Sequence, residues 1–538
     1  MAIAMLTHRT ALVACEHCRL RRRRCDRVRP SCSSCASQGV DCVYRPGTDP
    51  QPSQLVQELA SIRERLDHIS RLVQPPSSPS ILHSNVLAVT QPPSNSPSLV
   101  IKSPYLMQII GLRSDLSSFL YRLETAIPFT AASPAQFGRL AIPDEMTAGI
   151  LQKFQDEIHQ WYPILHPNFT LHFFETNASG FPHSTKSCLC LLVASIACLS
   201  DEHSQSPHFE TALSMVPIVF QESSVTSVQC LILFSIYYAC RVQPRTGYDY
   251  IQAASLRIQP LIKSGSFAQG SPESQLITRL YWTIYMIESE TSMHLRLATM
   301  GKSTCGPSTP MPMPTNAEIW DYFDDSTSPR SGSDKSVGEV PPPPFYFSTE
   351  LKLQRLWNKS VTPVMGTTNA CAAGEQPDAS QLMESLPPML HLGIPPASED
   401  ITTHPMQAAV SRSKYHLYEI SIYWPVIYGV IINGFADPEV LPYGPLFFES
   451  VTSFLCAASN AIRICPPKTW SLCASIYIIS MVAIRALDVP CLRRISQPEF
   501  WKYLKVSVDS LQRPSSLSPS VRYMRETLEN QMERASLQ

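Results

Sequence analysis

The chain has 538 residues, 16% of them charged, with a formal net charge of −1. It is long enough for more than one domain. The near-zero total hides an uneven distribution, because residues 1–45 sum to +6 and the remainder to −7. A basic head on an acidic body favours a modular nucleic-acid binder over an enzyme that acts on polyanions. The first apolar run, Met1 to Leu6, is short and follows no basic segment, so we do not expect a secretory signal.

Six cysteines with a repeated spacing follow a short tail, residues 1–14. They are Cys15, Cys18, Cys25, Cys32, Cys35 and Cys42. Zinc prefers four thiolate or imidazole ligands, and six thiolates satisfy two Zn²⁺ ions if two of them bridge. Three disulfides would fit a small secreted domain, which a chain of this length without an export signal does not resemble. His17 lies between two ligands, and we expect it to be an exposed helix residue rather than a ligand.

Residues 14–44 resemble the fungal Zn2Cys6 binuclear cluster family of transcription factors. The match rests on Ala14-Cys15-Glu16-His17-Cys18, the basic run up to Cys25, Pro30-Ser31-Cys32-Ser33-Ser34-Cys35 and Cys42-Val43-Tyr44. The resemblance implies a module at 15–44 that holds two Zn²⁺ ions, with Cys15 and Cys32 as bridging ligands. Pro30 matches the loop proline that joins the halves. Because so small a module buries little core, we expect zinc binding to supply its folding energy.

The arginines between the cysteines are the predicted DNA contacts. The resemblance implies that a short helix after the second cysteine enters the major groove and reads a CGG triplet. Arg22 falls where the family has a base-contacting lysine, and a guanidinium can bond guanine O6 and N7 in a bidentate manner. The backbone carbonyl of Arg21 would also face the bases, while Arg19 and Arg24 match positions near phosphates. A solvated charged face or a nuclear import signal is the alternative interpretation of this run. Import and DNA contact can use the same residues, so we expect a nuclear protein.

A proline-containing linker, 45–54, leads to a predicted dimerisation helix at 55–74. Its apolar residues follow a heptad spacing: Leu55, Leu59, Ile62, Leu66, Ile69 and Val73. This pattern predicts a short coiled coil and a homodimer on two DNA half-sites. Leucine at the a positions with isoleucine at d leans toward higher oligomers, and a single amphipathic helix docked on the chain is the alternative.

The next segment, 75–103, is rich in proline and serine and is predicted to be a disordered tether. Residues 104–530 then show helical periodicity, with flexible loops at about 303–346 and 362–400. Pro143-Asp144-Glu145 starts a helix whose apolar face would be Met146, Ile150, Phe154 and Ile158. Further helices are predicted at 186–200, 207–220, 225–241, 248–263, 274–295, 405–433, 446–464, 469–487 and 497–512. The predicted fold class is therefore mainly α: a two-zinc module, a short coiled coil and a large all-helical domain.

Three stretches of this helical region resemble the middle homology, or regulatory, domain of the same family. They run from Phe154 through Trp161-Tyr162-Pro163-Ile164-Leu165-His166-Pro167, then Ser227-Val228-Gln229-Cys230-Leu231, then Arg279-Leu280-Tyr281-Trp282-Thr283-Ile284-Tyr285. The resemblance implies a domain that controls activity and responds to a small-molecule effector or to the transcription machinery and its coactivators. Glu318 to Asp325 alternates acids with aromatics, as an activation segment does, although a loop pinned by its aromatics is the favoured interpretation.

Other functions find little support. The uncharged runs 223–240 and 469–484 are at or below membrane-spanning length, and we interpret them as buried core helices, with no membrane partner. Gly301-Lys302-Ser303-Thr304 lacks the first glycine of a phosphate loop, and no catalytic constellation is found, so we predict that the chain is not an enzyme. We expect a regulator of RNA polymerase II genes, specific to a metabolic or secondary-metabolite pathway. The alternative is a zinc-folded interaction protein that binds nucleic acid only weakly and acts through its helical domain.

Overall fold

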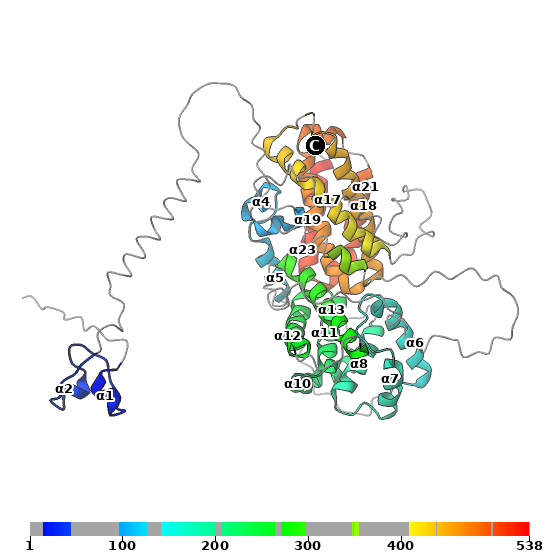
Figure 1. The fold of residues 1–538 in the computed structure, drawn as a ribbon. Helices are drawn as coiled ribbons and strands as arrows, with labels where there is room; N and C mark the ends of the chain where they lie inside the picture. Colours follow the sequence, from blue (N-terminus) through cyan, green and yellow to red (C-terminus); the bar gives the residue numbers. More distant parts are fainter. Residues whose placement is uncertain are drawn as a thin grey trace, which may run out of the picture. The chain divides into compact units, whose positions relative to one another are not determined.

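The computed structural model divides the chain into two compact units, Met1–Ala88 and Val89–Gln538 (Figure 1). It describes residues 14–44, 96–125, 141–199, 206–263, 271–295, 347, 349–354, 408–436, 438, 440–495 and 499–536. Within these residues the regular structure is helical and no strand is formed. The predicted fold class, mainly α, is confirmed.

The first half of the large unit is a group of helices around α8 and α11. Its elements are α6 (Asp144–Phe154), the π-helix η2 (Gln155–His159), α7 (Phe169–Ala178), α8 (Thr185–Ala197), α9 (Pro207–Ser214), α10 (Val216–Gln221), α11 (Val225–Cys240), α12 (Pro244–Lys263) and α13 (Pro272–Leu295). Helix α11 begins at a capping box, in which Ser224 and Ser227 bond each other's backbone N–H groups. Almost every side chain of α8 is buried, so this helix forms the centre of the group.

The second half packs around α19 (Figure 1). Its elements are α17 (Ala408–Asn433), α18 (Tyr443–Ile464), η7 (Pro466–Lys468), α19 (Thr469–Leu487), α20 (Pro490–Ile495), α21 (Glu499–Ser510), α22 (Gln512–Leu517) and α23 (Pro519–Ser536). Three earlier elements, η1 (Pro97–Lys102), α4 (Pro104–Ile109) and α5 (Leu116–Thr125), also belong here, because η1 contacts α19 and α5 contacts α23. One hydrophobic core is continuous through both halves.

Among the described residues, the stretch Pro466–Leu487 is long and apolar enough to cross a membrane, and 83% of its most apolar window is buried inside the unit. The runs at 223–240 and 469–484 lie largely in α11 and α19, where neighbouring helices cover them. Burial on all faces explains why these helices carry so few charges.

Two predictions about this unit were wrong in detail. Met146 is 56% exposed, and the buried face of α6 instead contains Thr147 and Leu151 beside Ile150 and Phe154. Residues four apart drift around a helix of 3.6 residues per turn, so a strict four-residue series leaves the buried face. The tether prediction also extended too far, because Ser96, Val100 and Ile101 are buried in the large unit.

Several helices were not predicted, including α5, α7 and α23. The start of α23 carries a readable signal, since Ser518 and Pro519 precede an apolar series of Val521, Met524 and Leu528. The coiled-coil residues 55–74, the acidic-aromatic segment 318–325 and the loops at 303–346 and 362–400 lie outside the described residues. Apart from the end of the tether, the predicted domain boundaries stay predictions.

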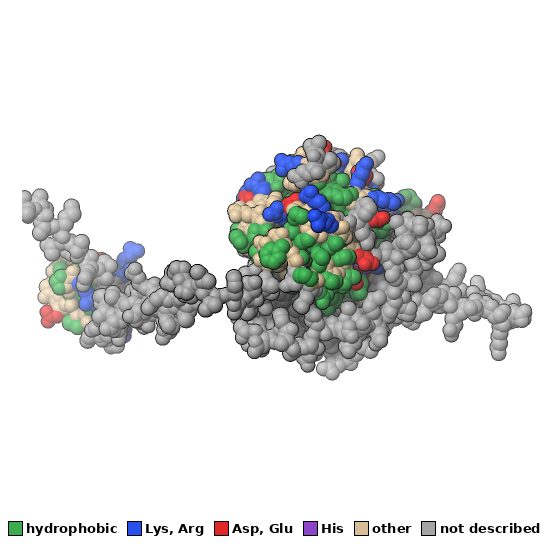
Figure 2. Space-filling model, turned by 90° about the horizontal axis from the view of Figure 1, so that it is seen from above, with side chains coloured by type: hydrophobic (Ala, Val, Ile, Leu, Met, Phe, Trp, Pro, Cys, Tyr) green, Lys and Arg blue, Asp and Glu red, His purple; other side chains and the backbone are tan. Residues whose placement is uncertain are grey.

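Basic side chains on the large unit occur in separate groups on the face seen in Figure 2, among hydrophobic and other side chains. The described arginines Arg21 to Arg24 of the small unit form a different pattern, because they follow one another in sequence and all are exposed.

Candidate metal centre and nucleic-acid interface

Two short helices organise the six-cysteine module. Helix α1 (Glu16–Leu20) begins after Cys15, whose Sγ accepts a hydrogen bond from the Cys18 backbone N–H at 3.5 Å. Helix α2 (Ser33–Ala36) begins in the same way after Cys32, whose Sγ accepts from the Cys35 N–H at 3.4 Å. Each helix therefore places two sulfurs on one side of its first turn.

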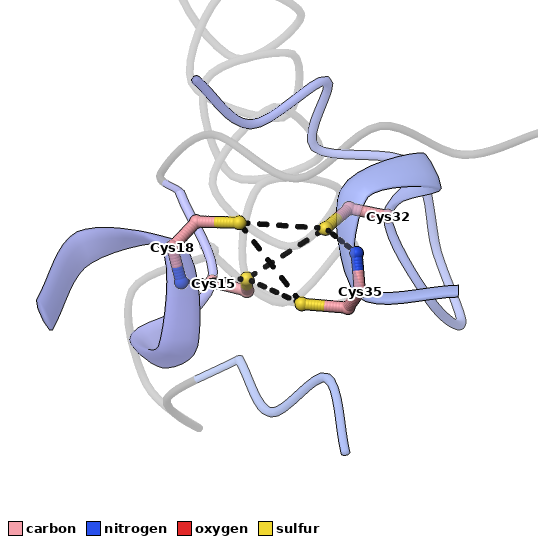
Figure 3. Close-up of side chains that lie close together, drawn as sticks. All are labelled: Cys15, Cys18, Cys32 and Cys35. Carbon is pink, nitrogen blue, oxygen red and sulfur yellow. Dashed lines mark hydrogen bonds between the residues drawn. The ribbon is translucent and has the colours of Figure 1, made fainter. Parts of the chain in front are cut away.

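Four sulfurs meet between these helices (Figure 3). Cys15 Sγ lies 3.8 Å from Cys32 Sγ and 3.6 Å from Cys35 Sγ. Cys18 Sγ lies 3.7 Å from Cys32 Sγ and 4.0 Å from Cys35 Sγ. Sulfurs at about 2.3 Å from a tetrahedral zinc are about 3.8 Å apart, so these spacings suit zinc.

The third cysteine of each half lies at the edge of this group. Cys25 Sγ is 4.0 Å from Cys15 Sγ, and Cys42 Sγ accepts a hydrogen bond from the Cys32 backbone N–H at 3.3 Å. Cys25 and Cys32 also lie within 4.8 Å of each other at their sulfurs. Cys15 thus has sulfurs of both halves within 4.0 Å, and Cys32 is close to sulfurs of the first half.

The chemistry of this donor set fits a divalent cation. Burial raises the pKa of the Cys15 thiol and raises that of Cys32 to about 12. The Cys15 and Cys32 thiols would hold their protons in the absence of a cation, and zinc replaces those protons because it binds thiolate. Backbone hydrogen bonds instead lower the pKa of Cys25 to about 7 and lower that of Cys42, so these two thiols give up their protons more readily. His17 is half-buried and is not part of the sulfur group.

The two halves also hold each other through hydrogen bonds that need no metal. The Glu16 backbone N–H donates to the Val43 carbonyl oxygen at 2.9 Å. At the equivalent position of the other half, the Ser33 N–H donates to the Asp26 carboxylate at 3.1 Å, and the Ser33 hydroxyl donates to the same group. Each helix start is therefore bonded by the residue after the third cysteine of the opposite half.

Asp26 and Tyr44 are residues of the module that sequence reasoning did not assign a role. The Tyr44 hydroxyl donates to the Val28 carbonyl oxygen at 3.1 Å, and the Arg29 guanidinium lies 5.1 Å from the centre of the Tyr44 ring. Asp26 directly follows Cys25, and Tyr44 is the second residue after Cys42. These positions next to the third cysteine of each half are the sequence signal that could have identified them.

The arginine run lies at the end of α1 and beyond it. Arg19 is inside the helix, Arg21 is its C-cap, and Arg22 to Arg24 follow. The helix thus begins before Cys18, whereas the expected helix followed it. The Arg23 N–H donates to the Cys18 carbonyl at 2.9 Å and the Arg22 N–H to the Arg19 carbonyl at 3.2 Å, which is the Schellman pattern. Arg22 has the positive φ, 49°, that this pattern requires.

In the large unit, buried hydrogen bonds join three stretches that are far apart in sequence. The Gln229 amide donates to the Ile164 carbonyl oxygen at 2.7 Å, and Arg279 Nε donates to the Pro163 carbonyl oxygen at 2.9 Å. Both side chains are 5% exposed. The three stretches around 161–167, 227–231 and 279–285 therefore meet in the folded unit, although they are far apart in sequence.

Comparison with known proteins matches both units. Residues 13–51 match the model of the fungal Zn(2)-Cys(6) binuclear cluster domain, and residues 151–392 match that of the fungal specific transcription factor domain. No solved structure matches the chain.

Curated relatives match over very different lengths. The putative transcription factor ecdB of Aspergillus rugulosus is 28% identical over 97% of this chain and 98% of its own. The transcriptional activator protein acu-15 of Neurospora crassa is 23% identical over 51% of this chain and 36% of its own. The sorbicillinoid biosynthetic cluster transcription factor sor4 of Hypocrea jecorina is 34% identical over 25% of this chain and 18% of its own.

Proposed function

Because the chain belongs to the fungal Zn2Cys6 binuclear cluster family of transcription factors, with two Zn²⁺ ions as cofactor, we propose that it reads CGG-type DNA triplets as a nuclear homodimer. The observation that carries this proposal is the exposed run Arg21 to Arg24, which begins where the zinc-module helix α1 ends. DNA binding and transcription regulation follow from the family. The triplet, the dimer and the site residues are proposals.

The six module cysteines are the proposed zinc ligands, with Cys15 and Cys32 bridging. Support comes from their sulfurs, since Cys15 Sγ lies within 4.0 Å of Cys25, Cys32 and Cys35. Bound zinc supplies folding energy rather than catalysis. The role of the protein's own residues is to hold the arginine run at a fixed place relative to the cluster.

Arg22 is the proposed base-reading residue. Its backbone conformation is set by the helix-ending hydrogen bonds of Arg22 and Arg23, so the side chain leaves the module from a defined point. A guanidinium bonds guanine O6 and N7 in the major groove. The Arg21 carbonyl would face the bases, and Arg19 and Arg24 would contact phosphates, which position the protein without reading sequence.

Dimerisation is proposed through the seam that begins at Leu55 and ends at Val73. This seam lies outside the described residues, and its support is the heptad spacing. A dimer would bind two triplets at once, which raises affinity through effective concentration.

We also propose a nuclear role in one biosynthetic pathway, with the large unit as the part that responds to an effector or a coactivator. The name of sor4 assigns that relative to a biosynthetic gene cluster. A fusion of residues 303–346 to a heterologous DNA-binding domain tests whether that segment recruits coactivators, and reporter silence would support a structural loop.

Selection of binding sites from random DNA tests the main proposal. Enrichment of paired CGG-type triplets is the expected result, and the Arg22→Gln variant should lose the triplet while keeping salt-dependent binding. Binding that depends on salt but enriches no motif would overturn the proposal and favour a zinc-folded interaction protein acting through its helical unit.

A further inference from the structure

A small cavity lies inside the large unit, where α13, α17 and α19 come together. Its volume is about 60 Å³. Its apolar wall is formed by Met293, Val410, Leu417 and Leu472. By comparison with the roughly 10–15 Å³ that one water needs, it has room for about four to six non-hydrogen atoms.

One side of the cavity is bounded by Glu290, Lys414 and Lys468, which form a group of four charges with Glu350 behind them. Lys414 Nζ lies 2.6 Å from Glu290 Oε1 and 2.8 Å from Glu350 Oε2. Lys468 Nζ lies 2.9 Å and 3.0 Å from the same two oxygens. Two ammonium groups and two carboxylates sum to zero, so the charges bordering the cavity are balanced within the protein.

The remaining polar groups of the cavity are neutral. Burial lowers the pKa of His294 to about 4, so its imidazole is uncharged near neutral pH. His294 Nε2 and Ser475 Oγ are 3.3 Å apart, which is within hydrogen-bond range. A charged ligand would lose its hydration here without meeting an unbalanced opposite charge, and such a loss is costly.

Two buried polar atoms of the lining have no hydrogen-bond partner among the described residues. They are Ser289 Oγ and His294 Nδ1, and their side chains are 5% and 1% exposed. Buried polar groups in folded proteins are nearly always bonded, so each of these atoms calls for a partner that occupies the cavity. One is a hydroxyl and the other a neutral ring nitrogen, and together they can both donate and accept.

We propose that this cavity is a binding site for a small uncharged molecule with a carboxamide or hydroxyl head group, which bonds Ser289 and His294 while its apolar part packs on Val410, Leu417 and Leu472. This inference deepens the proposed effector response of the large unit and rests on it for its biological meaning. Such a ligand provides the missing donor and acceptor and disturbs no ion pair.

Occupancy would stabilise the contacts between distant parts of the chain. The cavity and its charge group join α13, the segment 349–354, α17, η7 and the start of α19. A ligand that binds only when these parts are packed stabilises that arrangement by mass action.

Isobutyramide and isobutyrate are suitable test compounds because they have the same shape and differ in charge at neutral pH. The full-length, zinc-loaded chain is titrated with each compound at millimolar concentration. Binding is followed by ligand-observed NMR and by the melting temperature of the large unit. The amide should bind and raise the melting temperature, and isobutyrate should do neither. Ser289→Ala should weaken amide binding roughly tenfold, the effect of one lost hydrogen bond.

Ser480→Ala is the matched control, because Ser480 Oγ is also buried without a partner among the described residues but does not line the cavity. It should leave amide binding unchanged. Val410→Ile, which adds one methyl group to the wall, should abolish it. Absence of amide binding to the unaltered chain, equal binding of both compounds, or binding insensitive to Ser289→Ala would overturn the proposal. None of these outcomes bears on DNA site selection, which tests the proposed function separately.

Discussion

Arg22 and Gly39 occupy equivalent positions in the two halves of the zinc module, and both have a positive φ, 49° and 62° respectively. Each follows a short helix that ends with the same bonds: Arg23 N–H to the Cys18 carbonyl in one half, and Val40 N–H to the Cys35 carbonyl in the other. Glycine adopts this conformation freely, whereas a residue with a Cβ does not. The half that carries the arginine run therefore has a side chain where the other half has none.

Arg22→Gly is expected to stabilise the zinc module and to abolish its sequence-specific recognition of DNA. Relief of the left-handed conformation should stabilise the folded, zinc-bound module by about 1 kcal/mol. Loss of the guanidinium should abolish the preference for the triplet. Competition for zinc against a chelator and gel-shift assays measure the two effects. Arg23→Gly is the control, because Arg23 is outside the positive-φ region and glycine there should destabilise the module.

Removal of zinc should unfold residues 15–44 and abolish DNA binding, because so small a module depends on metal for its folding energy. The large unit is a separate compact unit with its own core and should keep its helical signal and its melting transition. Circular dichroism and gel shifts with and without a strong chelator provide the measurement. DNA binding that survives chelation would contradict this account.

Gln229→Leu should destabilise the large unit by about 1–3 kcal/mol, because it leaves the buried Ile164 carbonyl without its donor. Urea unfolding followed by circular dichroism measures the change. Gln152, which is exposed and bonds Asp156 on the surface, is the matched control. Gln152→Leu should change stability by less than about 0.5 kcal/mol. Equal effects of the two substitutions would mean that the hydrogen bond between Gln229 and the Ile164 carbonyl contributes nothing to the stability of the large unit.

Lys468→Met should destabilise the large unit by roughly 3–5 kcal/mol, because it leaves Glu290 and Glu350 with one ammonium group between them. Addition of Glu350→Gln to this variant restores the charge balance and should recover part of the loss. Urea unfolding of both variants is the measurement. If the double variant is less stable than Lys468→Met alone, the loss of stability does not come from unbalanced charge among Lys414, Glu290 and Glu350.

The stability of the large unit should fall with acidification below neutral pH. Burial holds the pKa of His294 at about 4, below the ordinary value near 6.5, so the unfolded chain takes up this proton first. Neutral His294 therefore makes its full contribution to the free energy of unfolding above pH about 6.5. This contribution, on the order of 3 kcal/mol, is lost as the pH falls toward 4.

His294→Phe should flatten this part of the pH profile of unfolding, and His172→Phe, at an exposed histidine, should not. At lower pH a second loss follows in both variants. The two lysines beside Glu290 bring the pKa of its carboxyl to about 2, so its contribution disappears as the pH falls from about 4.5 toward that value. An unchanged slope between pH 6.5 and 4 in His294→Phe would contradict the assignment.

Much of the local structure was predictable because its causes are local. The predicted helices 225–241 and 469–487 agree with α11 and α19 to within one residue, since caps and apolar composition act over a few neighbours. Met146 and the segment 97–102 were misjudged because burial there depends on what packs against them. Composition alone made 97–102 resemble a tether.

The amino-acid sequence by itself determined the repeated cysteine spacing, the arginine run inside it and the helical periodicity of the body, and from these the family and the two-zinc cofactor. Only the tertiary structure decided that Ile164 meets Gln229, that Lys414 and Lys468 share Glu290 and Glu350, and that a cavity with unsatisfied polar atoms lies beside them. These contacts join residues that are far apart in the chain. Their partners are selected by the packing of whole helices, which no local pattern of residues encodes.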